Sequence, residues 1–64
     1  MIIKTKTQIK TYDNLELKFI SDLYMGELLD TSVFIDGTHL CVIAGTDIQN
    51  FYDDFVNLMK KYRI

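Results

Sequence analysis

Hydrophobic and polar residues alternate through most of the first two thirds of the chain. Residues 2–12 are rich in Thr, Ile and Lys in alternation, and a two-residue period is typical of a strand with one buried face. A second alternating segment, LELKFI, follows the sequence Tyr12-Asp13-Asn14. We therefore predict strands over residues 2–12 and 15–25, joined by a tight turn.

The length of that turn decides which side chains share a face, because a slip of one residue moves each side chain to the opposite face. A two-residue turn would set Lys10 opposite Leu17 on one face. A three-residue turn, with Asn14 in the left-handed conformation that Asn tolerates, avoids this pairing. We predict the three-residue turn. It groups Ile9, Thr11, Leu15, Leu17 and Phe19 on one face, and Lys4, Lys6, Lys10, Glu16 and Lys18 on the other.

The next segment, SDLYMGELLD, is compatible with two structures. It either extends the second strand to Met25 or forms a turn of helix around Glu27 and Leu28. Tyr24 and Met25 beside Gly26 could form an exposed recognition patch, but packing is the favoured interpretation.

A hairpin is predicted for TSVFIDGTHLCVIAG, because Asp-Gly is a favoured two-residue turn between β-branched and aromatic residues. The strands cover residues 31–36 and 38–44. The pairs expected across the turn are Val33 with Leu40, Thr31 with Val42, Phe34 with His39, and Ser32 with Cys41. Ile43 is expected to join Phe34 and Cys41, which makes that face more apolar than a solvated sheet face needs to be.

The last third of the chain predicts an amphipathic helix over residues 47–62. Thr46 and Gln49 have the spacing of a capping box, and Asp47 in the first turn suits the helix dipole. Lys60, Lys61 and Arg63 suit the other end of the helix.

The apolar arc of this helix spans about 160°, whereas a helix that lies on one sheet needs about 100°. Four residues, Ile48, Tyr52, Phe55 and Met59, suffice to cover the chain's own sheet. Phe51, Leu58 and Val56 flank them and are expected to be available for a second contact, as are Phe34 and Ile43 on the sheet.

Together these elements predict one α+β domain over residues 1–64. It consists of an antiparallel meander of three to four strands, followed by one C-terminal amphipathic helix packed on the sheet.

The length of the chain indicates self-association. A domain of 64 residues has a marginal core and usually needs a disulfide, a structural metal or oligomerisation. One cysteine and one histidine supply neither a disulfide nor a zinc site. We therefore expect a homodimer. The alternating N-terminal residues resemble neither a signal peptide nor a membrane span, so we expect a cytoplasmic protein without a membrane partner.

Charge is segregated along the chain. The net charge is +2 over residues 1–20, −7 over residues 21–59 and +3 beyond, which gives −2 in total. An acidic surface can pair with a basic groove on another protein. We expect Asp47, Asp53 and Asp54 to form an acidic patch that faces a larger protein partner.

No residue pattern indicates catalysis. His39 and Cys41 are two apart and are expected on one face of a strand, but a structural metal site needs four ligands. Asp53 and Asp54 are expected to be solvated, and the three glycines are isolated. We predict that the chain is not an enzyme and that it binds no metal and no cofactor.

Two functional hypotheses follow. In size and charge layout the chain is similar to small inhibitor and accessory proteins of phages and other mobile elements, which implies a dimer that binds and modulates a larger protein. A strand meander followed by a C-terminal helix also resembles the single-strand-binding transcriptional coactivators. That resemblance implies a dimer that binds single-stranded nucleic acid. The predicted three-residue turn, and not the resemblance, groups Lys4, Lys6, Lys10 and Lys18 on one face as the candidate binding surface.

Overall fold

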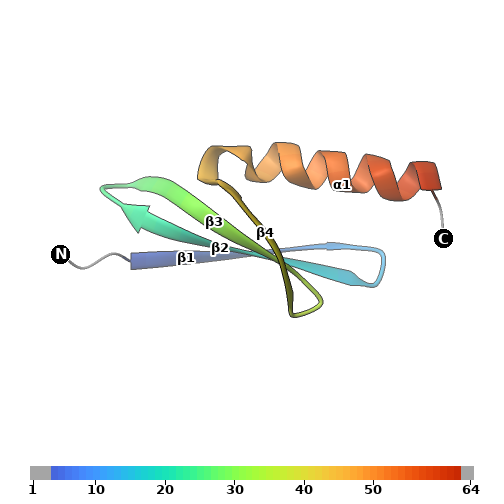
Figure 1. Ribbon diagram of the computed structural model, residues 1–64, viewed down its shortest axis with the longest axis horizontal. Helices are drawn as coiled ribbons and strands as arrows, with labels where there is room; N and C mark the ends of the chain where they lie inside the picture. Colours follow the sequence, from blue (N-terminus) through green and yellow to red (C-terminus); the bar gives the residue numbers. More distant parts are fainter. Residues whose placement is uncertain (1–3, 63–64) are drawn as a thin grey trace.

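The computed structural model describes residues 4–62 and confirms the predicted α+β fold class (Figure 1). An antiparallel sheet of four strands in the order β1-β2-β3-β4 is followed by a short 3-10 turn, η1, and one helix, α1, that packs on the sheet. Residues 2 and 3 of the expected first strand, and Arg63, lie outside the described residues. The elements are β1 (Lys4–Tyr12), β2 (Leu15–Tyr24), β3 (Glu27–Ile35), β4 (Thr38–Ala44), η1 (Gly45–Asp47) and α1 (Ile48–Tyr62).

The turn between β1 and β2 has two residues, so the prediction of a three-residue turn is wrong. Tyr12 pairs with Leu15, and Lys10 lies opposite Leu17. Asp13, rather than Asn14, has a positive φ of 58°. The face beneath α1 accommodates Lys10 because a lysine can lay its aliphatic stem along apolar surface and keep its amine outside.

Contacts with α1 hold Lys10 in this position. Its Nζ lies 5.2 Å from the centre of the Tyr52 ring and donates a hydrogen bond of 3.4 Å to Oε1 of Gln49. A cation above an aromatic face is attracted by the ring quadrupole. The helix therefore supplies partners that the sequence pattern of the strands alone does not reveal.

The pairing defines two faces of the sheet, which we name by their relation to α1. Directly paired residues share a face, and faces alternate along each strand. The helix-side face carries Lys4, Lys6, Gln8, Lys10, Tyr12, Leu17, Phe19, Ser21, Thr31, Val33, Ile35, Cys41 and Ile43. The open face carries Thr5, Thr7, Ile9, Thr11, Glu16, Lys18, Ile20, Asp22, Ser32, Phe34, His39 and Val42.

The segment that the sequence left undecided forms a second tight hairpin. β2 runs to Tyr24, Met25 and Gly26 form the turn with φ of 51° and 79°, and β3 begins at Glu27. Glu27 and Leu28 are thus in a strand and not in a helical turn. The side chain of Met25 is 85% exposed, so the expectation that it packs is wrong.

The β3–β4 hairpin has the expected two-residue turn at Asp36 and Gly37, both with positive φ. Phe34 pairs with His39 as expected. An extra residue in β4, Leu40, then shifts the register, so that Cys41 lies opposite Val33.

This β-bulge overturns the other expected pairs of the hairpin. Thr31 pairs with Ile43 and Ser32 with Val42, because a bulge sets two residues of one strand against one of its partner. Ile43 therefore lies on the helix-side face, opposite to the face of Phe34.

The chain enters α1 through η1, where Gly45 is buried. A Cβ atom on Gly45 would lie 2.5 Å from Cβ of Leu28, so only glycine fits against β3 here. Thr46 lies within η1. The side chain of Gln49 donates to Asp53 and accepts from Lys10, and it does not close the predicted capping box with Thr46.

The buried apolar core is small. It consists of Leu17, Phe19, Val33 and Ile48, with the ring of Phe51 edge-on to Phe19 at a centroid distance of 6.1 Å. The molecule measures 45 × 20 × 15 Å. In Figure 1, α1 runs along one side of this long twisted sheet.

Candidate functional site

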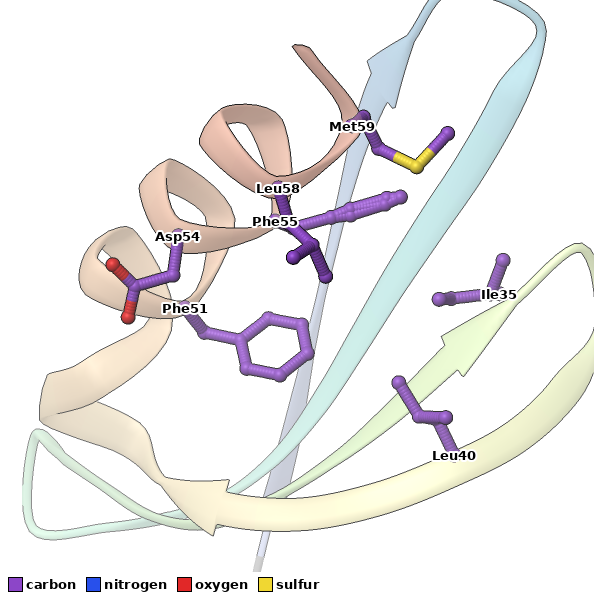
Figure 2. Close-up of a pocket in the computed structure, with 7 residues that line it drawn as sticks. All are labelled: Ile35, Leu40, Phe51, Asp54, Phe55, Leu58 and Met59. Atoms are coloured by element: carbon purple, nitrogen blue, oxygen red, sulfur yellow. The ribbon is translucent and has the colours of Figure 1, made fainter. Parts of the chain in front are cut away.

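An open apolar pocket lies between α1 and the β3–β4 hairpin (Figure 2). Its volume is about 490 Å³. We call it the apolar groove. Its lining consists of Ile35, Leu40, Phe51, Asp54, Phe55, Leu58 and Met59.

The helix contributes to the apolar groove through residues spaced by three or four positions, which share one side of a helix. Phe51, Phe55 and Met59 form one row, and Leu58 lies beside them. Figure 2 shows these apolar side chains directed toward the hairpin, whereas the carboxylate of Asp54 points away from them. The wide apolar arc predicted from the sequence is therefore only partly used against the sheet.

The sheet contributes Ile35 and Leu40. Leu40 is the extra residue of the bulge in β4, and its side chain points toward the helix in Figure 2. Leu40 and Leu58 remain 54% and 57% exposed. Two large aliphatic side chains thus face solvent across the apolar groove, a feature that marks interaction sites when such residues lie together.

The five residues predicted for self-association lie in different places. Leu58 lines the apolar groove, and Phe51 lines its inner wall but also packs on the core. Val56 lies on the other flank of α1, in a hollow shared with Tyr12, Tyr52, Asp53, Asn57 and Lys60.

The two sheet residues of that set lie on opposite faces. Ile43 packs against the core from the helix-side face. Phe34 is half-buried on the open face, where its ring lies edge-on to the ring of His39, with the two ring centres 5.2 Å apart. The interface that combined Phe34 with Ile43 is therefore split by the sheet.

The three predicted acidic residues are all exposed. Asp54 borders the apolar groove, and Asp47 lies in η1. Asp53 lies on the other flank of α1, where it accepts a 2.9 Å hydrogen bond from Gln49. The acidic side chains therefore spread around the helix.

The lysine face predicted from the three-residue turn does not form. Lys4, Lys6 and Lys10 lie on the helix-side face, and Lys18 lies opposite Phe34 on the open face. Lys10 is engaged by Tyr52 and Gln49.

Lys4 and Lys6 are exposed on β1. Lys4 borders a hollow with Leu23, Tyr24, Met25 and Gly26 at the β2–β3 turn. This arrangement sets a cation beside an exposed aromatic side chain. The sequence pattern marked Tyr24 and Met25 but favoured their burial.

His39 and Cys41 do not share a face, contrary to the prediction. The bulge at Leu40 sets His39 opposite Phe34 and Cys41 opposite Val33. Within residues 4–62, no three side chains of His, Cys, Asp or Glu form a group that could hold a metal ion.

Sequence reasoning missed Leu40 as a groove residue, because nothing in THLCVIA signals the bulge that turns Leu40 toward the helix. It also missed Ile35 and Met59. Ile35 is two residues after Val33 and therefore lies on the same face of the strand. It could have been predicted by placing the helix over the turn end of the hairpin.

Comparison with protein-family models, curated proteins and solved structures found no match to this chain. In the part of the chain that the structure describes, α1 is too short and too polar to cross a bilayer.

Proposed function

We propose that this chain is a small non-catalytic protein-interaction module that forms a homodimer and binds, and thereby modulates, a larger protein. The observation that carries the proposal is the apolar groove. Its rim includes Leu40 and Leu58, both more than half exposed. Removal of apolar surface from water is favourable, by roughly 25 cal/mol per Å².

Self-association is supported by the small size of the core. Among residues 4–62, the buried apolar core consists of four residues, and small domains are commonly completed by oligomerisation. A second copy that covers the apolar groove would extend the core of each copy. Closed two-fold dimers are the commonest oligomers.

Binding of a larger partner is supported by the exposed acidic side chains on η1 and α1. Asp47, Asp53 and Asp54 present carboxylates in a segment without lysine or arginine from residue 21 to residue 59. A basic surface on the partner would be attracted to them, with the strongest effect on the rate of association. The module would then block or adapt that surface, in the manner of phage inhibitor and accessory proteins.

The proposal is tested by the molar mass in solution, measured by light scattering at micromolar concentrations in low and high salt. We expect a dimer at both salt levels, because apolar contacts are not screened by ions. Leu58→Asp should shift the mass toward the monomer. Tyr62→Asp is the matched control, since Tyr62 is an exposed residue of the same helix outside the groove lining.

A monomeric wild-type protein at all concentrations would refute the homodimer. A dimer that both variants leave intact would show that the apolar groove does not hold the copies together. Circular dichroism of each variant checks that the helix is retained.

Single-stranded nucleic-acid binding is the alternative function, and one observation favours it. Lys4 and Lys6 are exposed at the end of the sheet where Tyr24 is also exposed, and single-strand sites combine cations with aromatic side chains on which bases stack. The net charge of −2 and the separation of Lys18 from the other lysines weigh against it. We therefore rank it second.

A further inference from the structure

The two edges of the sheet differ in charge. β1 forms one edge and β4 the other, and among residues 4–62 each pairs with only one neighbouring strand. β1, with the sequence KTKTQIKTY, carries three lysines, whereas β4, with the sequence THLCVIA, carries no Lys, Arg, Asp or Glu.

Edge strands expose unpaired N–H and C=O groups that can pair with another strand, and lysines on an edge oppose such pairing. β1 is protected in this way. Neither charge nor proline protects β4. The bulge at Leu40 disrupts β4 near its first residues. Residues 41–44 pair regularly with β3 and carry no charge, so they form a regular and uncharged outer edge.

We propose that the β4 edge is the surface through which two copies of this chain pair, antiparallel, to form one continuous eight-stranded sheet; this inference rests on the proposed function and specifies its dimer interface. Two copies of an uncharged edge meet without like-charge repulsion. Two β1 edges would instead bring two sets of lysines together. The occupant of the β4 edge is therefore a second copy, joined about a two-fold axis.

The same pairing also serves the apolar groove. Antiparallel pairing about an axis perpendicular to the sheet keeps both helices on one side of the joined sheet. Leu40 lies on β4 itself, next to residues 41–44, and faces α1 (Figure 2). Strand pairing thus brings the partner copy to the side of the molecule where Leu40 and Leu58 are exposed, and main-chain hydrogen bonds and apolar contacts act at one interface.

Two matched variants test the inference. Val42 and Ile9 are both 57% exposed, both lie on the open face, and they occupy the β4 and β1 edge strands. Val42→Glu places two carboxylates near the two-fold axis, where pairing would partly desolvate them. Ile9→Glu adds the same charge at the opposite edge, opposite Lys18.

We expect Val42→Glu to weaken self-association about tenfold or more, measured by sedimentation equilibrium. Ile9→Glu should leave the dissociation constant within about twofold of the wild type. Amide hydrogen exchange gives the direct readout. Those amides of residues 41–44 that point away from β3 should be protected in the dimer and exposed in Val42→Glu, whereas the outer amides of β1 exchange rapidly in both.

The other outcomes are distinguishable. A dimer that tolerates Val42→Glu but dissociates with Leu58→Asp overturns the β4 edge and leaves the proposed function in place. Equal weakening by Val42→Glu and Ile9→Glu would indicate that the open faces stack, which also overturns the inference alone. A wild-type monomer would overturn both the inference and the homodimer.

Discussion

At the residue scale, a pair of buried hydroxyls lies in the sheet beside the apolar core. Oγ of Ser21 and Oγ1 of Thr31 are 2.7 Å apart, and Oγ1 of Thr31 donates to the carbonyl oxygen of Leu29 at 3.2 Å. Thr31 has one hydroxyl proton, which it gives to Leu29, so Ser21 must donate to Thr31. The chain of donors therefore runs from β2 into β3, and both residues are fully buried.

This direction predicts unequal effects of two substitutions. Thr31→Val removes the acceptor of Ser21 and leaves a buried hydroxyl without a partner, at a cost of about 1–3 kcal/mol. Ser21→Ala leaves Thr31 bonded to Leu29 and should cost about 1 kcal/mol or less. Urea unfolding of the two variants measures the difference. A larger cost for Ser21→Ala would show that the donors run the other way.

The position of Lys10 shows where reasoning from single residues failed. If lysine is treated as uniformly polar, the alternation of the strand predicts Lys10 away from the apolar face. Its charged end instead reaches Tyr52 and Gln49, which come from a helix distant in sequence. Contacts between residues so far apart in the sequence cannot be recognised from the alternation of a single strand.

At the element scale, the sequence predicted the strands, the final helix and the Asp36-Gly37 hairpin. Each has a local signal: alternation for strands, an amphipathic period for the helix, and a favoured dipeptide for the turn. The bulge at Leu40 has no such signal in the sequence of β4. Its position moved Cys41 and Ile43 to the helix-side face and Phe34 away from them.

The junction between sheet and helix yields a second prediction. Gly45→Ala should destabilise the fold by about 1–3 kcal/mol, because a Cβ atom there would meet Leu28, including its backbone, at 2.5–2.7 Å. Thr46→Ala is the control at the next position, where the side chain is exposed. It should change stability by about 0.5 kcal/mol or less. Thermal unfolding followed by circular dichroism compares the two.

A cost of Thr46→Ala near that of a lost helix cap, about 1 kcal/mol, would contradict the structure. It would indicate that the capping box of Thr46 and Gln49 forms after all.

At the scale of the whole molecule, the candidate site could be predicted only in part. The width of the helix's apolar arc indicated unused surface, and Leu58 is indeed exposed. Phe51, expected beside it, turns inward onto Phe19. The apolar groove is lined by side chains of both α1 and the β3–β4 hairpin, so its lining depends on how these elements are placed and not on either element alone.

The segregation of charge along the chain gives a prediction for the alternative function. If Lys4 and Lys6 contact phosphates, Lys4→Ser with Lys6→Ser should weaken binding of a single-stranded oligonucleotide. The slope of log K against log salt concentration should fall in magnitude by about 1.4. Lys60→Ser with Lys61→Ser removes the same charge from the other end of the fold and is the control. Fluorescence anisotropy at several salt concentrations measures both slopes.

Absence of binding by the wild-type protein at low salt would end the nucleic-acid hypothesis. Equal slopes in the two double variants would show that any binding is a response to overall charge and not to the end of the sheet near Tyr24.

The unequal edges of the sheet also bear on how far assembly can proceed. A sheet with two receptive edges adds copies without limit, as fibrils do. Here one edge is receptive and the other carries lysines, so pairing of two β4 strands leaves a lysine-bearing β1 at each outer border. Growth would stop after a single addition, and the chain would remain a discrete particle even at the concentrations at which sheet proteins polymerise.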